Sequence, residues 1–233
     1  MKISIMVDRV KQRMVKQARA AEWEARFEPN SDGFRPGRKT WDAIGAIYAQ
    51  LNQQPTWVLE ADIAKCCDRI DHDALLRKLN AQPTLSRQIN SWLQAGVLDK
   101  GDWYPTDAGT PPGGPGSPLL ANVALHGLEE RVQQAFPGRR APAVTRYADD
   151  LVVLHPDRDV IEPSQALIAE HLRGMGLALK LSKTRITHTL HVEAGGAGFD
   201  VLGFNIRHYP TKAKRGYKTI IKPSRRAMVH HTR

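Results

Sequence analysis

Apolar and polar residues are distributed along the chain in a pattern that predicts helices separated by short strands. Residues 2–27 place apolar side chains among basic ones, which is typical of a basic amphipathic helix. Further helices are predicted at residues 41–53, 73–80, 85–96, 117–136 and 162–179. Strands are predicted at residues 57–63, 184–190, 199–209 and 217–223, and on both sides of a tight turn at Asp149 and Asp150. Glycine and proline mark residues 28–40 and 101–118 as loops.

Several predicted helices carry signals at their ends. Ser117 is a candidate N-cap for the long helix at residues 117–136, with Pro118 in its first turn. Gly96 is expected to end one helix, and Gly174 or Gly176 another.

The order strand, helix, hairpin, helix, strand is typical of a split βαβ sheet with helices on one face. The predicted fold class is therefore α+β with an antiparallel sheet. In such a sheet the first strand lies beside the hairpin, so Asp62 at the end of that strand comes near Asp149 and Asp150 at the turn. Two adjacent aspartates are equally well explained as a polar turn between apolar strands. Asp62 supplies a third carboxylate at the same edge.

Three converging carboxylates repel one another unless cations lie among them. Two unit charges about 4 Å apart repel by roughly 1 kcal/mol in water and by about 4 kcal/mol at an effective dielectric constant near 20. Oxygen ligands select hard cations such as Mg²⁺, which also accepts substrate phosphates. Two such ions about 3.5–4 Å apart can activate an attacking hydroxyl and stabilise the leaving oxygen of a phosphoryl displacement.

The net charge indicates what such a site would act on. The chain of 233 residues has 34 Lys and Arg against 24 Asp and Glu, a formal charge of +10, which favours nucleic acid over a membrane surface as partner. Its two cysteines, Cys66 and Cys67, are neighbours, and the longest apolar runs fall short of a membrane span. These features predict a protein of the cytoplasm without a membrane partner, acting in nucleotidyl transfer on nucleic acid.

Ordered sequence blocks then identify a family. YADD at Tyr147–Asp150 resembles the polymerase box of reverse transcriptases. Five further blocks resemble the group II intron-encoded reverse transcriptase/maturase, in order and over nearly the whole chain: GFRPGRKTWDAI (Gly33–Ile44), LEADIAKCCDRIDH (Leu59–His72), GTPPGGPGSPLLAN (Gly109–Asn122), GLALKLSKT (Gly176–Thr184) and FDVLGFNIR (Phe199–Arg207).

The resemblance implies a polymerase palm with part of the fingers. Residues 1–56 would be partial fingers, 57–198 the palm, and 199–233 the primer-grip hairpin with a truncated C-terminal end of the palm. The implied activity is RNA-directed DNA synthesis with two Mg²⁺ ions. The implied partners are an RNA template, a DNA primer, deoxynucleoside triphosphates and group II intron RNA.

The resemblance also implies roles by position. Asp62, Asp149 and Asp150 would hold the metal ions, assisted by the Ile63 carbonyl. The other implied contacts are Cys67, Gly113 and Lys183 with the nucleotide, Gly114, Arg35 and Arg38 with the template or nucleic-acid backbone, and Leu202, Gly203 and Phe204 as the primer grip.

Four positions depart from the family pattern. Cys67 replaces a phenylalanine that helps to reject ribose, Pro112 replaces a glutamine, Gly116 replaces a branched aliphatic residue, and Asp32 replaces a common tyrosine. The blocks also lead us to expect that the upstream fingers and the downstream thumb are missing. Two alternatives stay open: a remnant that binds RNA without productive catalysis, and a non-templated nucleotidyltransferase, which the primer-grip and GFRPGR blocks disfavour.

Overall fold

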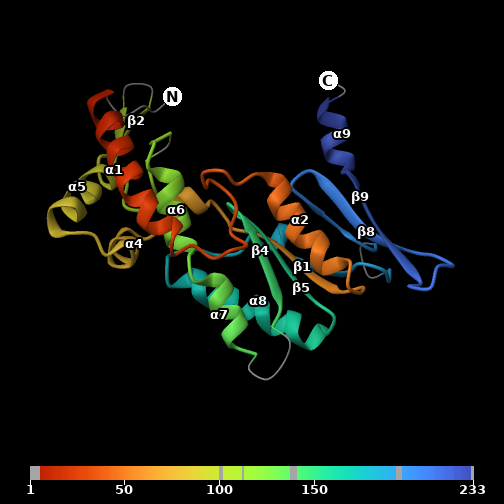
Figure 1. Ribbon diagram of the computed structural model, residues 1–233. Coiled ribbons are helices and arrows are strands. Elements are labelled where there is room, and N and C mark those ends of the chain that lie inside the picture. The colour runs from red at the N-terminus through yellow and green to blue at the C-terminus, as the bar shows by residue number, and fades with distance from the viewer. Residues whose placement is uncertain (1–5, 100–101, 112, 137–140, 193–195, 232–233) are drawn as a thin grey trace.

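A four-stranded antiparallel sheet forms the centre of the computed structural model, which describes residues 6–99, 102–111, 113–136, 141–192 and 196–231 (Figure 1). Its strand order is β4-β5-β1-β6. The strands of this sheet are β1 (Trp57–Asp62), β4 (Ala143–Tyr147), β5 (Asp150–His155) and β6 (Arg185–His188). A second antiparallel sheet contains β7 (Phe199–Val201), β8 (Phe204–Pro210) and β9 (Tyr217–Pro223), and β2 (Val97–Asp99) pairs with β3 (Asp102–Tyr104).

Helices lie at the predicted positions, and two further helices, at Cys66–Arg69 and Arg225–His231, were not predicted. The helices are α1 (Met6–Glu24), α2 (Thr40–Leu51), α3 (Cys66–Arg69), α4 (His72–Leu79), α5 (Pro83–Leu93), α6 (Ser117–Leu125), α7 (Leu128–Gln134), α8 (Arg158–Arg173) and α9 (Arg225–His231), with a 3₁₀ turn η1 at Leu181–Lys183. Among the described residues, no helix is long and apolar enough to cross a membrane.

The prediction of one long helix at residues 117–136 is wrong. The chain breaks between α6 and α7, where Gly127 adopts a left-handed φ of 84° that other residues rarely accept. The α7 backbone then finds a partner elsewhere, because Glu28 Oε1 accepts from the Glu129 N–H at 2.9 Å. Ser117 is also not an N-cap: it is the first residue of α6, and its hydroxyl donates to the Pro111 carbonyl at 2.8 Å.

Two smaller differences concern strands. Residues 199–209 form two strands instead of one, because Leu202 and Gly203 turn the chain with φ values of 50° and 84°. The predicted loop at residues 101–118 contains the short strand β3, which pairs with β2.

Alternate residues of the central strands bury opposite faces of the sheet. Leu59, Leu151 and Val153 face a core that includes residues of α6, α7 and α8, the helical layer that the split βαβ prediction expects. Val58 and Val152 face a second core with Ile44 and Ile47 of α2 and with residues of β7 and β8. One face of the sheet is therefore covered by α6, α7 and α8, and the opposite face by α2 and the second sheet (Figure 1).

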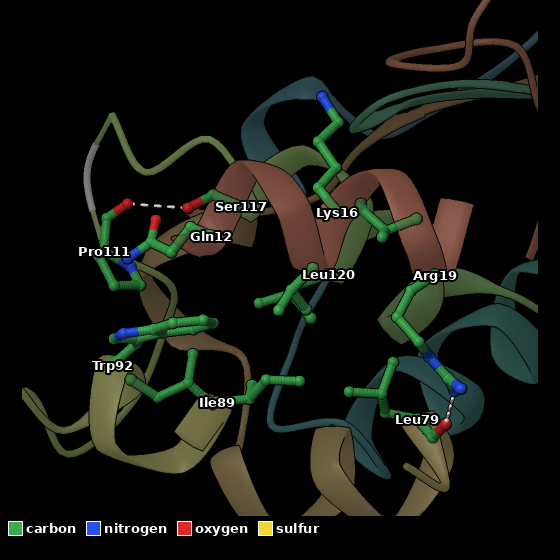
Figure 2. A pocket seen from close by; sticks show the side chains of 13 residues that line it. Gln12, Lys16, Arg19, Leu79, Ile89, Trp92, Pro111, Ser117 and Leu120 are labelled. Carbon is green, nitrogen blue, oxygen red and sulfur yellow. Dashed lines mark hydrogen bonds between the residues drawn. The ribbon is translucent and has the colours of Figure 1, made fainter. Parts of the chain in front are cut away.

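The N-terminal helix is joined to the rest of the molecule across a small apolar pocket. Figure 2 shows Leu79, Ile89, Trp92 and Leu120 around it, beneath α1. At one end Arg19 of α1 donates to the Leu79 carbonyl at 2.7 Å. Apolar packing with one hydrogen bond at its rim thus attaches α1 to α4, α5 and α6.

Candidate active site

Two acidic residues face each other at the end of neighbouring strands. Asp62 of β1 and Asp150 of β5 are directly paired in the antiparallel register, which puts opposing Cβ atoms about 4.5–5.5 Å apart. Asp149 lies in the tight turn between β4 and β5, and its carbonyl accepts from the Ile63 N–H at 3.1 Å. β1 and β5 pair in this register because their apolar residues, among them Leu59, Leu151 and Val153, are buried in the core. The predicted convergence of strand and hairpin is thus present in the sheet.

Crowding of negative charge changes the acid chemistry of this edge. Burial, together with the nearby Asp149 and Asp62 carboxylates, raises the pKa of Asp150 to about 6. Asp62 is only 7% exposed, and Lys183 donates to its Oδ2 atom. Asp62 in turn raises the pKa of the Lys183 ammonium. A lysine therefore supplies the positive charge that these carboxylates require.

The donor atoms fit a hard divalent cation in kind. Carboxylate oxygens are the ligands Mg²⁺ prefers, and a cation among them would relieve the repulsion that raises the pKa of Asp150. In the side-chain arrangement present, no group of three or more His, Cys, Asp or Glu residues within the described ranges is set to hold a metal ion. Lys183 pairs with Asp62, and its side chain is 46% exposed.

An open cleft of about 670 Å³ is lined by Asp62 and Asp150 but not by Asp149. Lys183, Leu202 and Gly203 line the same cleft. The Gly203 carbonyl is held by the N–H of Ser224 at 2.8 Å, which ties the turn to the end of β9. The proposed primer-grip turn and the acidic edge therefore border the same cleft, while Phe204 begins β8 just beyond it.

A second hollow, of about 320 Å³, is lined by Asp149. It is also lined by Cys67, Phe34 and Ala148, among others. Cys67 is an exposed residue, but its thiol is partly buried. This burial raises the pKa of the thiol, and the nearby Asp149 carboxylate raises it as well. The residue predicted to contact the nucleotide therefore lies in a hollow beside a catalytic candidate.

The two predicted glycines lie before α6. Gly113 has a φ of 67° and open space where a side chain would extend, whereas a Cβ on Gly114 would lie 3.0 Å from Ser117 Oγ. Neither lines the hollow beside Cys67. The departure at Pro112 lies outside the described residues.

Arg146 is the site residue that the sequence reasoning missed. It is 3% exposed, and its Nη1 atom donates to the Asn122 Oδ1 atom and to the Ala148 carbonyl, both at 3.0 Å. Its Nη2 atom donates to Ser31 Oγ, and Asn122 Nδ2 donates to the Gly33 carbonyl at 2.8 Å. Arg146 thus fixes the turn that carries Asp149. Its signal in the sequence was a lone arginine within an apolar strand.

The two arginines of the GFRPGR block differ in their surroundings. Arg35 is 9% exposed and donates to Glu24 Oε2 at 2.9 Å and to the Ser31 carbonyl at 2.8 Å. It holds the loop together, so its predicted contact with nucleic acid finds no support in the structure. Arg38 is more accessible and pairs with Asp32 Oδ1 at 3.2 Å. The departure at Asp32 thus supplies a buried partner for Arg38.

Comparisons with known proteins identify the family. The family described as reverse transcriptase (RNA-dependent DNA polymerase) matches residues 1–206. The group II intron-encoded protein LtrA of Lactococcus lactis subsp. cremoris is 36% identical over 135 residues, which is 57% of this chain and 22% of that protein. Protein YkfC of Escherichia coli is 28% identical over 229 residues, covering 80% of this chain and 58% of that protein. The chain therefore spans less than two thirds of either relative.

Solved structures agree on the fold. A telomerase structure from Candida tropicalis, in complex with a fragment of telomeric RNA, matches with a TM-score of 0.65 at 14% identity. The match covers 84% of this chain and 35% of that one. The apo telomerase of the same organism truncated from its C-terminal domain also matches with a TM-score of 0.65, at 12% identity, over 92% of this chain and 45% of that one.

Proposed function

This chain belongs to the reverse transcriptase family, and from that premise we propose that its cleft copies RNA into DNA. The reaction would transfer a nucleotide from a deoxynucleoside triphosphate to the 3′ hydroxyl of a DNA primer on an RNA template. The observation that carries the proposal is the pairing of Asp62 with Asp150 across β1 and β5, with Asp149 in the adjoining turn. An acidic edge of this kind, on a chain of net charge +10, suits phosphoryl transfer on a polyanion.

Members of this family generally use divalent metal. We propose that Asp62, Asp149 and Asp150 hold two Mg²⁺ ions, with the Ile63 carbonyl as a further ligand. Bound there, the ions would supply the charge that activates the primer hydroxyl and stabilises the leaving oxygen. Lys183 would exchange its contact with Asp62 for a phosphate oxygen of the incoming nucleotide, as its exposed side chain allows.

The remaining candidates would orient the substrates. Cys67 would face the sugar of the incoming nucleotide from its hollow beside Asp149. Gly113 and Gly114, without side chains, would let nucleotide and template approach the backbone. The primer end would lie against Leu202, Gly203 and Phe204, two of which border the cleft. Arg38 would contact the nucleic-acid backbone, and Arg35 would act on it only by shaping the loop.

The RNA partner can be narrowed. Because LtrA is a group II intron-encoded protein and is 36% identical over 135 residues, we propose that group II intron RNA is bound by this chain. A protein in a cob intron of Schizosaccharomyces pombe is also similar, at 35% identity over 129 residues, or 54% of this chain and 16% of that protein.

A second candidate function is RNA binding without catalysis. The contact of Lys183 with Asp62 favours it, since the carboxylate is already neutralised. The small side chain at Cys67 favours it as well, because the family aromatic is lost there. On this alternative the acidic edge is a paired structural feature.

A primer-extension assay separates the two candidates. We expect the wild-type chain to extend a DNA primer on an RNA template with Mg²⁺ and dNTPs, and to stop when EDTA removes the metal. Asp149→Asn should abolish extension and leave binding of the template-primer intact, because that carboxylate is exposed and outside the core. Binding without extension by the wild-type chain would favour the RNA-binding alternative.

A further inference from the structure

An exposed aromatic side chain stands just outside the cleft. Trp41, in the first turn of α2, is 65% exposed. Its ring lies 5.1 Å from that of half-buried Phe204, at an interplanar angle of 51°. Isolated exposed apolar residues are common on protein surfaces, but this one rests on a second ring that holds one side of it. At 65% exposure, Trp41 keeps most of its indole surface open to solvent.

The pair continues the wall of the cleft. Phe204 follows directly on Leu202 and Gly203, which line the cleft together with Asp62 and Asp150. Figure 1 shows α2 beside the sheet of β7, β8 and β9, so Trp41 approaches this wall from a separate segment of the chain. Trp41 therefore lies beside the residue that directly follows the Leu202–Gly203 turn of the cleft wall.

The charges around the pair suit a polyanion. Exposed Lys39 lies two positions before Trp41, and exposed Lys222 lies in β9 next to Pro223, the pairing partner of Phe204. Exposed Arg225 and Arg226 follow β9 and also line the cleft. The exposed carboxylates are fewer and are engaged: Asp42 accepts from the Lys39 N–H at 2.6 Å, and Asp200 accepts from Asn205 Nδ2 at 2.7 Å. Basic residues beside an open aromatic face are the combination that binds single strands of nucleic acid.

We propose that Trp41, seated on Phe204, is a stacking platform for an unpaired base of the nucleic-acid strand at the mouth of the cleft. The inference rests on the proposed function in so far as the cleft binds nucleic acid. Stacking is tolerant of sequence because every base has a π face. It also neutralises no phosphate, so it should add affinity without adding to the salt dependence.

Binding of labelled oligonucleotides to the full chain tests the proposal. The probes are a fluorescein-labelled single-stranded RNA of mixed sequence and an RNA–DNA template-primer with a single-stranded overhang, each titrated at several salt concentrations. Trp41→Leu keeps an apolar contact with Phe204 but removes the π face, and Trp41→Phe restores a ring. Tyr48→Ala is the matched control, since Tyr48 is an exposed aromatic on the same helix at 42% exposure.

We expect Trp41→Leu to weaken binding of both probes by roughly tenfold, within the range for removal of one base–aromatic stack. Its log–log salt slope should equal that of the wild type. Trp41→Phe should recover most of the affinity, and Tyr48→Ala should leave it within about twofold, because no stack is lost. Wild-type affinity in Trp41→Leu, an equal loss in Tyr48→Ala, or a reduced salt slope would each overturn the proposal.

Two further readouts keep this result separate from that of the proposed function. If the wild type fails to extend primers while Trp41→Leu still loses affinity as expected, the polymerase proposal fails and the platform stands. If the wild type extends primers and Trp41→Leu binds normally, only the platform fails. Sedimentation without nucleic acid measures the oligomeric state. If the wild type is a dimer that Trp41→Leu dissociates, while the affinity for both probes is unchanged, the Trp41–Phe204 pair is a self-association surface and the inference is overturned.

Discussion

Asp150 is the residue at which burial and like charge act together. Its carboxyl has a pKa raised to about 6 from 3.8, by burial first and then by Asp149 and Asp62. Lys183 lowers it, but less than these effects raise it. In the metal-free protein, the folded state is therefore more stable when the Asp150 carboxyl is protonated than when it is charged.

The pH dependence of stability follows from this direction. A carboxyl with a raised pKa in the folded state binds protons more readily than in the unfolded chain, so its contribution is full below about pH 4 and is lost as the pH rises through about 6. Asp150→Asn keeps a neutral group at every pH. In metal-free buffer, its melting temperature relative to the wild type should rise between pH 4 and 7. A constant difference over this range would contradict the raised pKa.

Metal binding should act on the same charges. Mg²⁺ is expected to raise the melting temperature of the wild type at pH 7, because a ligand that binds only the folded state stabilises it. Asp149→Asn should reduce the shift, whereas Asp159→Asn, an exposed carboxylate in the first turn of α8, should retain it. Identical melting curves with and without Mg²⁺ for the wild type would exclude a shared metal site.

The sugar preference depends on Cys67. Replacing it by phenylalanine puts an aromatic ring into the hollow beside Asp149. Cys67→Phe should raise the preference for deoxynucleotides over ribonucleotides, since the larger ring leaves less room for a 2′ hydroxyl. The measurement is the ratio of incorporation of each dNTP to its rNTP in an active protein. An unchanged ratio would mean that the sugar does not lie against this residue.

At the scale of elements, the loop before α2 is pressed against the β4–β5 turn. A Cβ on Gly33 would lie 2.1 Å from the Ala148 backbone nitrogen. Arg146 and Asn122 tie the same two segments together through hydrogen bonds. The position of Asp149 therefore depends on a loop more than a hundred residues earlier in the chain.

Gly33→Ala tests this contact. The added methyl group has only backbone to move, so we expect a loss of stability on the order of 1–3 kcal/mol and a larger relative loss of primer extension. Gly45→Ala is the control, because Gly45 lies in α2 with open space around it. That change should stabilise the protein by about 0.5–1 kcal/mol through helix propensity. Chemical denaturation of both variants measures the difference.

Features set by local sequence patterns could be predicted, whereas features set by contacts between distant segments could not. Most of the helices and the β4–β5 hairpin follow from patterns within each segment. The pairing of Asp62 with Asp150 follows from the split βαβ order of the elements. The break before α7 does not follow from a local pattern, because Glu28, in another segment, accepts a hydrogen bond from the Glu129 N–H of α7. Likewise Arg35 looks like a surface cation in the sequence and is buried because Glu24 of α1 reaches it.

At the scale of the whole molecule, the net charge of +10 should govern affinity for nucleic acid. Binding of template-primer is expected to weaken steeply with salt, with a log–log slope of roughly −0.9 for each phosphate neutralised on duplex DNA. Arg225→Gln, at the rim of the cleft, should make the slope shallower by about one unit. Arg131→Gln should leave it unchanged, since Arg131 pairs with Glu170 on the helical face at 3.3 Å. Equal slopes for wild type and Arg225→Gln would remove this arginine from the interface.

The place of β1 in the sheet also sets the order in which the protein can be assembled. Both partners of β1, β5 and β6, come later in the chain, and Lys183 follows its partner Asp62 by 121 positions. During synthesis β1 thus leaves the ribosome with two open edges and stays unpaired until β5 has emerged. Such long-range closure slows folding, and unpaired edges invite association with other chains. The arrangement that brings the three aspartates together therefore leaves the edges of β1 exposed for as long as the nascent chain is incomplete.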